Sequence, residues 1–185
     1  MQEKRNQGVR SSHTRRLVTA ALFAAICFGM TMLSVPLPVV GYGNLGDCFV
    51  LLSGWLLGPL WGAAAAGVGT ALADVTLGYG VYAPATFVIK ALMAVTVYFM
   101  GSLLSGSSTC VKRRLFAHVA AAACGEVLMV CGYFVYESLL FGVATATASL
   151  LGNGVQATAG IVISTVMIAV IRGNKALNEM FIKEK

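Results

Sequence analysis

Residues 48–73 read CFVLLSGWLLGPLWGAAAAGVGTALA, an apolar stretch without a single charged side chain. This stretch could form one long helix, or two short helices that turn at Gly58, Pro59 and Gly62, because proline cannot continue a hydrogen-bonded helix. The remaining apolar segments of the chain are separated more clearly. The choice between one helix and two therefore sets the number of helices, and with it the fold.

The composition of the whole chain places these helices in a lipid bilayer. Hydrophobic residues make up 58% of the 185 residues, charged residues make up 11%, and the mean hydropathy is +0.82. A typical soluble domain is about 45–50% apolar and about 25% charged. The composition excludes a secreted disulfide scaffold, a disordered tail, a coiled coil and an ordinary cytosolic enzyme. Spans of about 20 residues leave room for roughly six helices.

The basic residues mark one side of the membrane. They cluster before residue 17, at Lys112 to Arg114 and after residue 171, and only Lys90 falls inside an apolar stretch. Two helices within 48–73 put all three clusters on one side, as the positive-inside rule requires. We therefore predict an all-α integral membrane bundle of six transmembrane helices with both termini in the cytoplasm. The net charge of +6 then reports topology, and no nucleic acid partner is expected.

These helices divide the chain into three parts. The prediction is a basic cytoplasmic tail over 1–16, a six-helix transmembrane domain over 17–171 and a cytoplasmic C-terminal tail over 172–185. A polar loop is expected over 40–46, an inner loop over 105–114 and outer loops over 78–83 and 141–149. The predicted helices cover about 17–35, 47–57, 61–77, 84–104, 115–140 and 150–171.

Several embedded polar residues share one predicted depth, at the end of the bundle opposite the basic clusters. Ionisable groups in a membrane are costly unless they pair or line a wet cavity, so they indicate a binding site by default. The tyrosines of the outer loops add stacking faces, and the set suits a small, flat, polar ligand. The embedded residues are Asp47, Asp74, Lys90, Glu137, Asn153 and Gln156, and the loop tyrosines are Tyr42, Tyr79 and Tyr82.

Structural alternatives exist for these residues. Lys90 could form an ion pair with Asp74 or Glu137 instead of contacting a ligand. Asp47 is interpreted first as a helix cap, since an acidic side chain at a helix start satisfies free amides and the dipole. Glu126 lies mid-span on the same face as Glu137, and we interpret it as a buried packing residue.

The remaining candidates also have two interpretations. The amides of Asn153 and Gln156 could join helices to one another, and the loop tyrosines could form an interfacial aromatic belt. A stripe of small residues on the first helix could pack inside the bundle or against a partner helix. The stripe consists of Ala20, Ala21, Ala24 and Ala25.

Motifs for catalysis are missing from the sequence. The chain contains no phosphate-binding loop, no HExxH, no GxSxG and no Cys/His cluster, so we expect no enzyme activity, no metal site and no cofactor. The odd number of cysteines, five, and their apolar surroundings indicate small core residues. Energy for any transport must therefore come from an ion gradient or from partner proteins.

The motifs of the outer half resemble those of a known family. Asn44-Leu45-Gly46-Asp47, Gly58-Pro59-Leu60-Trp61-Gly62 and Tyr82-Ala83-Pro84-Ala85-Thr86 through Lys90 look like the substrate-binding S component of energy-coupling-factor (ECF) vitamin transporters. Gly132-Tyr133-Phe134 with Glu137, and Gly152-Asn153 with Gln156, are similar to the later helices of the riboflavin-type branch. That branch also contains pyridoxine and hydroxymethylpyrimidine transporters.

The resemblance implies a function and a set of site residues. Such proteins are multi-pass proteins of the bacterial cell membrane that capture a vitamin outside, and they assemble with a transmembrane T component and two cytoplasmic ATPases. The alanine stripe would then meet the T component. The substrate-binding residues implied or proposed are Tyr42, Asn44, Asp74, Tyr82, Thr86, Lys90, Tyr133, Glu137, Asn153 and Gln156.

We expect the ligand to be a small aromatic vitamin or precursor, with a pyridoxine-like or hydroxymethylpyrimidine-like compound ahead of riboflavin. Two other functions remain open from the sequence. One is an autonomous proton-coupled permease that uses the embedded carboxylates, and the other is a membrane assembly protein whose polar groups only join helices.

Overall fold

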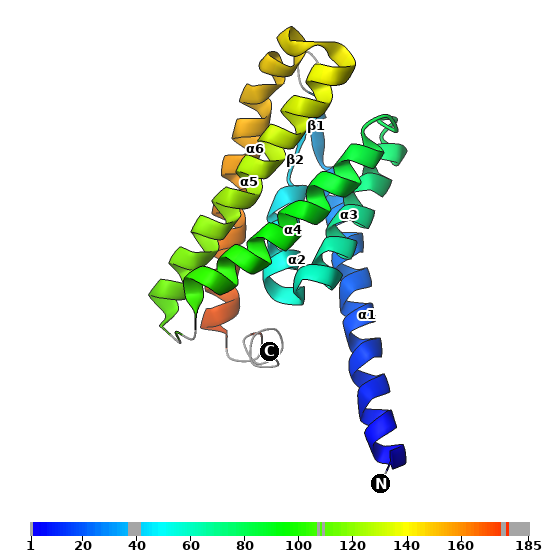
Figure 1. The fold of residues 1–185 in the computed structure, drawn as a ribbon, viewed down its shortest axis with the longest axis vertical. Coiled ribbons are helices and arrows are strands. Elements are labelled where there is room, and N and C mark those ends of the chain that lie inside the picture. Colours follow the sequence, from blue (N-terminus) through cyan, green and yellow to red (C-terminus); the bar gives the residue numbers. More distant parts are fainter. Residues whose placement is uncertain (1, 37–41, 107, 109, 175–176, 178–185) are drawn as a thin grey trace.

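The computed structural model describes the backbone of residues 2–36, 42–106, 108, 110–174 and 177, and the side chains of these residues apart from 2–12, 35, 36 and 42. The described chain forms six α-helices and one short hairpin (Figure 1). The strands β1 (Ser34–Pro36) and β2 (Tyr42–Asn44) pair antiparallel, with Ser34 opposite Asn44. The helices are α1 (Gln2–Met32), α2 (Gly46–Leu57), α3 (Pro59–Thr76), α4 (Ala83–Ser105), α5 (Val111–Phe141) and α6 (Val143–Gly173).

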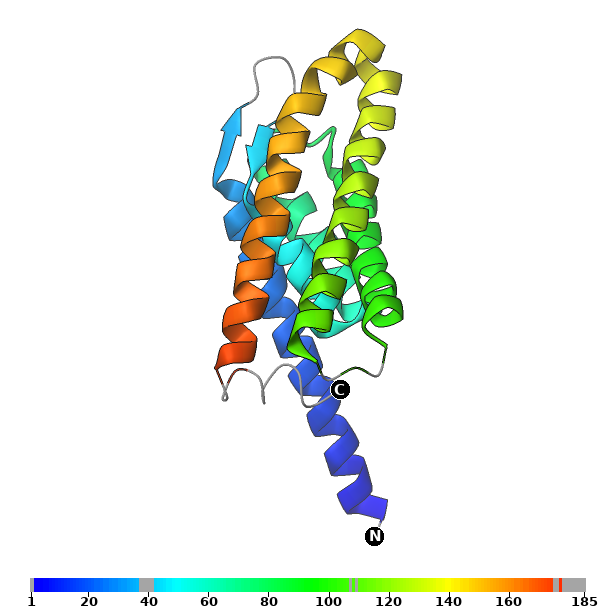
Figure 2. The same ribbon diagram turned by 90° about the vertical axis from the view of Figure 1, so that its left-hand side faces the viewer.

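The prediction of an all-helical six-helix bundle is confirmed. Within the described residues, four helices are long and apolar enough to cross a membrane: α1 from His13 onward, α4, α5 and α6. The shorter α2 and α3 complete the bundle between them (Figures 1 and 2). The hairpin is the one addition to the predicted helices among the described elements.

The apolar stretch 48–73 does divide into two helices, as the sequence predicts. Gly58 lies between α2 and α3 with φ 88°, a left-handed conformation that favours glycine. Pro59 follows as the first residue of α3, where its missing N–H costs no helical hydrogen bond. The chain thus reverses within a single turn, and α2 and α3 pack against each other.

Helix α2 is the centre of the bundle. It has only 12 residues, yet it packs against α1, α3, α4 and α6, and in Figure 1 it lies between the longer helices. Val50, Leu51 and Leu52 are buried in the hydrophobic cores. Because α2 is enclosed, a polar residue in its first turn is also enclosed, and this placement creates the site described below.

Helices α1 and α3 approach closely through small residues. A Cβ on Gly69 of α3 would clash with the backbone carbonyl of Ala24 on α1, so only glycine fits at this crossing. Ala20 is buried on the same side of α1, whereas Ala21 and Ala25 are exposed. The alanine stripe is therefore divided: Ala20 and Ala24 lie toward the bundle, and Ala21 and Ala25 lie on its outer surface.

Three boundaries differ from the prediction. Helix α1 begins at Gln2, so the basic segment before residue 17 is helical and projects beyond the bundle (Figure 2). Helix α5 begins at Val111, which places the basic cluster 112–114 in its first turn. The predicted outer loop over 141–149 is wrong, because only Gly142, with φ 87°, separates α5 from α6. The alanines and threonines of 144–147 continue the helix.

Candidate functional site

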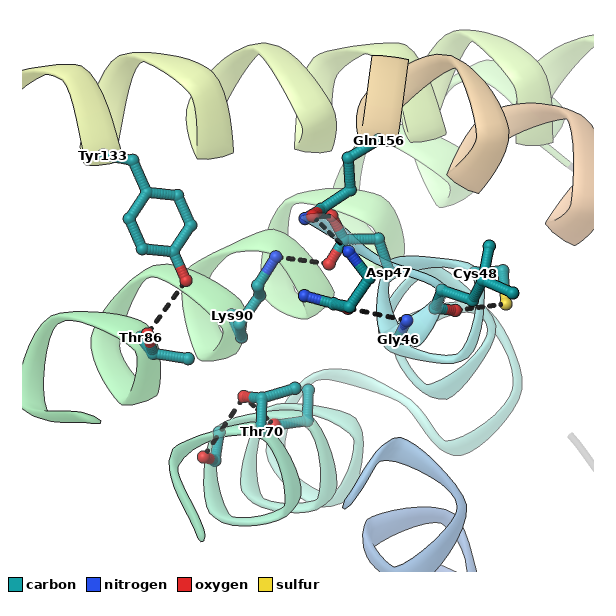
Figure 3. A network of polar contacts seen from close by, with 12 residues as sticks. Gly46, Asp47, Cys48, Thr70, Thr86, Lys90, Tyr133 and Gln156 are labelled. Carbon is teal, nitrogen blue, oxygen red and sulfur yellow. Dashed lines mark hydrogen bonds and ion pairs between the residues drawn. The ribbon is translucent and has the colours of Figure 1, made fainter. Parts of the chain in front are cut away.

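A buried ion pair lies at the centre of the described polar residues. The ammonium of Lys90, on α4, donates to Oδ1 of Asp47, in the first turn of α2, and their side chains are only 2% and 1% exposed. Gln156 of α6 donates from Nε2 to the other carboxylate oxygen of Asp47 at 2.5 Å. Figure 3 shows the three side chains meeting from three different helices. Asp47 is thus paired at both oxygens.

The same network continues to the hairpin. Oε1 of Gln156 accepts a hydrogen bond from the backbone amide of Asn44, at the end of β2, at 2.8 Å. The side chain of Asn44 in turn accepts from the amide of Gly46 at 2.7 Å. One chain of hydrogen bonds therefore joins the hairpin to α2, α4 and α6, and these contacts hold the segment before α2 in place.

An aromatic ring stands next to the buried ammonium. Nζ of Lys90 lies 5.4 Å from the ring centroid of Tyr133, on α5, within the range of a cation–π contact. The hydroxyl of Tyr133 forms a 2.9 Å hydrogen bond with the hydroxyl of Thr86, one turn before Lys90 on α4 (Figure 3). The ammonium therefore lies over one face of the Tyr133 ring, and the aromatic ring borders the buried network.

A second group lies nearer the Gly142 end of the bundle. The hydroxyl of Tyr82 donates to Oε1 of Glu137 at 3.3 Å, and the hydroxyl of Tyr136 donates to the backbone carbonyl of Val81 at 2.5 Å. The ring of Tyr82 is stacked on Phe141, with centroids 6.1 Å apart, and contacts further tyrosine rings at 5.9–6.5 Å. These contacts connect the turn between α3 and α4 to the end of α5 and stabilise its position.

Several buried polar atoms have no partner among the described residues. They include both carboxyl oxygens of Glu126, Oε2 of Glu137 and the amide nitrogen of Asn153. An unpaired buried polar group costs about 1–3 kcal/mol, and more when it is charged. Structures retain such groups rarely, and a ligand or ion is one explanation for them. These four atoms lie on α5 and α6, which also carry Tyr133 and Gln156.

The structure corrects the interpretation of Asp47. The residue before α2 is Leu45, which makes no side-chain capping bond, and the amide of Gly46 is satisfied by Asn44. The carboxylate of Asp47 is engaged with Lys90 and Gln156 instead. The ion pair of Lys90 is thus with Asp47, whereas the sequence suggested Asp74 or Glu137. The sequence predicts one depth for all three acids, so Asp47 was also available as a partner of Lys90. Which of these acids pairs with Lys90 depends on the rotation of each helix about its own axis.

The other predicted residues have the following positions. Asp74 is 2% exposed near the end of α3, and its backbone carbonyl accepts the amide of Tyr79. Asn153 is buried one turn from Gln156 on α6. Tyr42 belongs to β2, but its side chain lies outside the described residues. The structure therefore joins Asn44, Thr86, Lys90, Tyr133 and Gln156 around Asp47, and it pairs Tyr82 with Glu137.

A separate polar contact lies toward the Arg114 end of the bundle. His118 of α5, fully buried, forms a 3.1 Å hydrogen bond from Nε2 with the hydroxyl of Ser164 on α6. The ring of Trp55 meets it edge-on at 4.9 Å. This cluster contains no carboxylate. Among the described residues, no group of three or more His, Cys, Asp or Glu side chains could hold a metal ion.

Comparisons with known proteins agree with this fold. A family model described as the S component of an ECF-type riboflavin transporter matches residues 11–173. An uncharacterised protein from Pyrococcus woesei is 37% identical over 140 residues, which cover 75% of this chain and 88% of that protein.

A solved structure supports the same architecture. It is described as "Structure and mechanism of the S component of a bacterial ECF transporter", and it matches with a TM-score of 0.61 over 86% of this chain and 95% of the other. At 24% identity this likeness concerns the fold alone. The family assignment rests instead on the family model, which matches most of the sequence. The chain belongs to the family of S components of ECF-type riboflavin transporters, which are non-catalytic, multi-pass subunits in the cell membrane.

Proposed function

We propose that this chain captures a small aromatic vitamin or vitamin precursor outside the cell and delivers it for ATP-driven uptake by partner subunits. A pyridoxine-like or hydroxymethylpyrimidine-like compound is favoured over riboflavin. The observation that carries the proposal is the buried Lys90–Asp47–Gln156 network, with Tyr133 beside it and unpaired polar atoms on α5 and α6.

The balance of hydrogen-bonding groups supports a ligand that donates. Four buried carboxyl side chains, Asp47, Asp74, Glu126 and Glu137, accompany one buried lysine among the described residues. Three carboxyl oxygens and one amide nitrogen lack a partner in Glu126, Glu137 and Asn153. A ligand with N–H and O–H donors would satisfy most of these atoms. Hydroxymethyl and amino groups on a nitrogen heterocycle have this character.

The aromatic residues support a flat ligand. Tyr133 offers its face beside Lys90, and Tyr82 lies in a group of aromatic rings near the Gly142 end. Aromatic pairs prefer offset or edge-to-face arrangements at centroid distances of about 4.5–7 Å. A six-membered heterocycle near Tyr133 would gain such contacts, while the neighbouring amide and carboxyl groups bind its edges.

The charge pattern supports a cytoplasmic location for both termini. The basic cluster 112–114 lies in the first turn of α5, and Arg172 lies in the last turn of α6, so both are at the same end of the antiparallel pair. Loops rich in lysine and arginine remain in the cytoplasm. The buried Lys90 network and the hairpin then lie toward the outer side of the membrane, where a substrate-capture protein meets its ligand.

Assembly with a T component and two ATPase subunits follows from the proposed role, and the outer face of α1 is the proposed contact. Ala21 and Ala25 are exposed and four residues apart, so another helix can approach closely there. Replacing both by leucine should prevent copurification of the T component while ligand binding stays unchanged. Copurification at the wild-type level would contradict the contact.

The matched variant for that experiment is Ala24→Leu. Ala24 lies against Gly69 of α3, so a larger side chain there disturbs the bundle itself. We expect Ala24→Leu to lower thermal stability, whereas the double variant at Ala21 and Ala25 leaves the stability of the isolated chain nearly unchanged. Equal losses of stability would indicate that the outer face also packs within the chain.

A ligand screen tests the substrate. Purified protein is heated with pyridoxine, hydroxymethylpyrimidine, riboflavin and other vitamins, and native mass spectrometry records any molecule that copurifies. Binding adds RT ln(1 + [L]/Kd) to the stability, so about 2.7 kcal/mol is expected at 100 times Kd. No stabilisation by any vitamin would contradict the proposal. Uptake by this chain alone, driven by a pH gradient in proteoliposomes, would instead support a proton-coupled permease.

A further inference from the structure

Glu126 is the one buried carboxyl residue in the described chain with neither oxygen engaged. It lies mid-way along α5 with 2% of its surface exposed, and neither Oε1 nor Oε2 has a hydrogen-bonding partner among the described residues. The nearest network does not supply one, because Lys90 and the amide nitrogen of Gln156 are both directed at Asp47. If the carboxyl group served only for packing, the free-energy cost of burying its two unpaired oxygens would not be compensated by any hydrogen bond.

The opposite helix packs directly against the carboxyl group. A Cβ built on Gly160 of α6 would stand 2.5 Å from Oε1 of Glu126 and 3.2 Å from Cβ of Asp47. Glycine therefore keeps α6 free of a side chain where Glu126 and Asp47 approach each other. The arrangement places the unpaired carboxyl next to the Lys90 network, so both can contact one ligand.

The spacing along α5 fits a ligand of one ring. Glu126 and Tyr133 are seven residues apart, so they lie on the same face of the helix about 10 Å apart along its axis. The ammonium of Lys90 is near the Tyr133 end of this interval. Once a contact of about 3 Å is allowed at each end, a single six-membered ring with its substituents matches the interval more closely than a three-ring system.

A carboxyl group offers a particular edge to such a ring. A protonated carboxyl carries an O–H donor next to a C=O acceptor, and an ionised carboxylate carries two acceptors. An aminopyrimidine presents an amino N–H donor beside a ring nitrogen, which accepts when neutral and donates when protonated. A protonated carboxyl with a neutral ring, and an ionised carboxylate with a protonated ring, each form two parallel hydrogen bonds to this edge. Pyridoxine has no amino group beside its ring nitrogen.

We infer that Glu126 is a specificity-determining residue of this site and that its carboxyl group pairs with the amino edge of an aminopyrimidine ligand. The inference rests on the proposed function and narrows its ligand class. It adds Glu126 to the site, although the sequence indicated only a packing role for this residue.

The test compares two ligands and two substitutions. The ligands are 4-amino-5-hydroxymethyl-2-methylpyrimidine and the analogue with hydrogen in place of the amino group. Glu126→Met keeps the length of the side chain and removes both oxygens, whereas Glu126→Gln keeps one donor and one acceptor. We expect Glu126→Met to weaken binding of the amino compound at least about tenfold and binding of the analogue much less. Glu126→Gln should recover most of the loss.

The melting temperature of the ligand-free protein distinguishes a ligand-binding role of Glu126 from a packing role. Removing an unpaired buried carboxyl should leave the melting temperature of Glu126→Met equal to or above that of the wild type. Wild-type affinity of Glu126→Met, or equal losses for both ligands, would overturn the inference while the proposed function stands. If the wild type binds riboflavin alone, or no vitamin, the proposed ligand class fails and the inference fails with it.

Helix α6 offers a matched pair of glycines as a second test. Gly160→Ala should displace the Glu126 carboxyl and reduce affinity for the amino compound, because the new Cβ would stand closer to Oε1 of Glu126, at 2.5 Å, than to Cβ of Asp47, at 3.2 Å. Gly154→Ala is the control, since a Cβ at Gly154 has no atom within 4 Å. Equal affinities of the two variants would argue against a ligand contact at Glu126.

Discussion

The two polar regions of this bundle differ in which polar atoms they leave without a partner and in how many elements they join. Toward the Arg114 end, His118 and Ser164 make one hydrogen bond between two helices, with Trp55 against the imidazole, and a single ring nitrogen of His118, Nδ1, has no partner among the described residues. Around Asp47, a charged network joins the hairpin to α2, α4 and α6, and a carboxyl group with two unpaired oxygens lies beside it. Helix packing needs only the first kind of contact. The second kind costs more free energy than helix packing requires, and this excess supports the ligand binding proposed above.

The largest expected effect comes from removing the buried ammonium. Lys90→Met leaves the carboxylate of Asp47 buried without its cation, so we expect a loss of about 3–5 kcal/mol in stability, together with loss of ligand binding. Thermal unfolding and binding assays measure the two effects. The double variant with Asp47→Asn removes both charges and should regain most of the stability without regaining binding. If binding also returned, the network would be structural like the His118 cluster.

Gln156→Ala should have the next largest effect. This amide links Asn44 and Asp47, and its loss breaks two hydrogen bonds, one of them to a carboxylate. We expect about 2–4 kcal/mol of destabilisation and weaker ligand binding. Hydrogen exchange of the amide of Asn44 should become faster, because its acceptor is gone. Unchanged exchange would show that the hairpin is held by other contacts.

A packing variant at the opposite end should separate stability from binding. A Cβ on Gly101 of α4 would clash with the ring of Trp55, so Gly101→Ala should cost about 1–3 kcal/mol through overpacking. Ligand affinity should remain at the wild-type value, because the clash lies away from the Asp47 network. A parallel loss of affinity would mean that the two ends of the bundle are coupled.

The smallest effect on the site is expected for Ser164→Ala. This change removes the one hydrogen bond of the buried His118 side chain and the bond from Ser164 to the carbonyl of Ile161, a loss of about 1–3 kcal/mol in stability, and no carboxylate is involved. Calorimetric unfolding would detect the shift, and ligand affinity should not change. A substantial drop in affinity would contradict the division of the bundle into a packing end and a binding end.

Much of the fold could be predicted from the sequence because proline and charge act locally. Pro59 divides the central apolar stretch, and the distribution of lysine and arginine then favours six helices. The hairpin was missed because its three-residue strands carry no alternating pattern. The short loop predicted after α5 was wrong because alanine and threonine at 144–147 interrupt the apolar pattern without interrupting the helix.

The site was less predictable for a different reason. Sequence spacing placed Asp47, Lys90 and Gln156 at one depth, but the pairing between them joins residues 43 and 109 positions apart and depends on the rotation of each helix. The packing assigned to Glu126 agreed with its burial, and only the three-dimensional structure reveals that both oxygens are unpaired. The depth of each polar residue in the membrane can be predicted from the sequence, whereas its hydrogen-bonding partner depends on how the helices pack.

The unequal lengths of the helices have a consequence for the surrounding lipid. Helices α5 and α6 have 31 residues each and α2 has 12, so they extend about 46 Å and about 18 Å at 1.5 Å per residue. A hydrocarbon layer of about 30 Å is thinner than the first pair, so these helices tilt, thicken the bilayer around them or extend their polar ends, such as Lys112 to Arg114, out of the hydrocarbon. Such a molecule experiences hydrophobic mismatch along one side only. Lipids with longer acyl chains would relieve it, so bilayer thickness becomes a physical control on how this protein is oriented in its membrane.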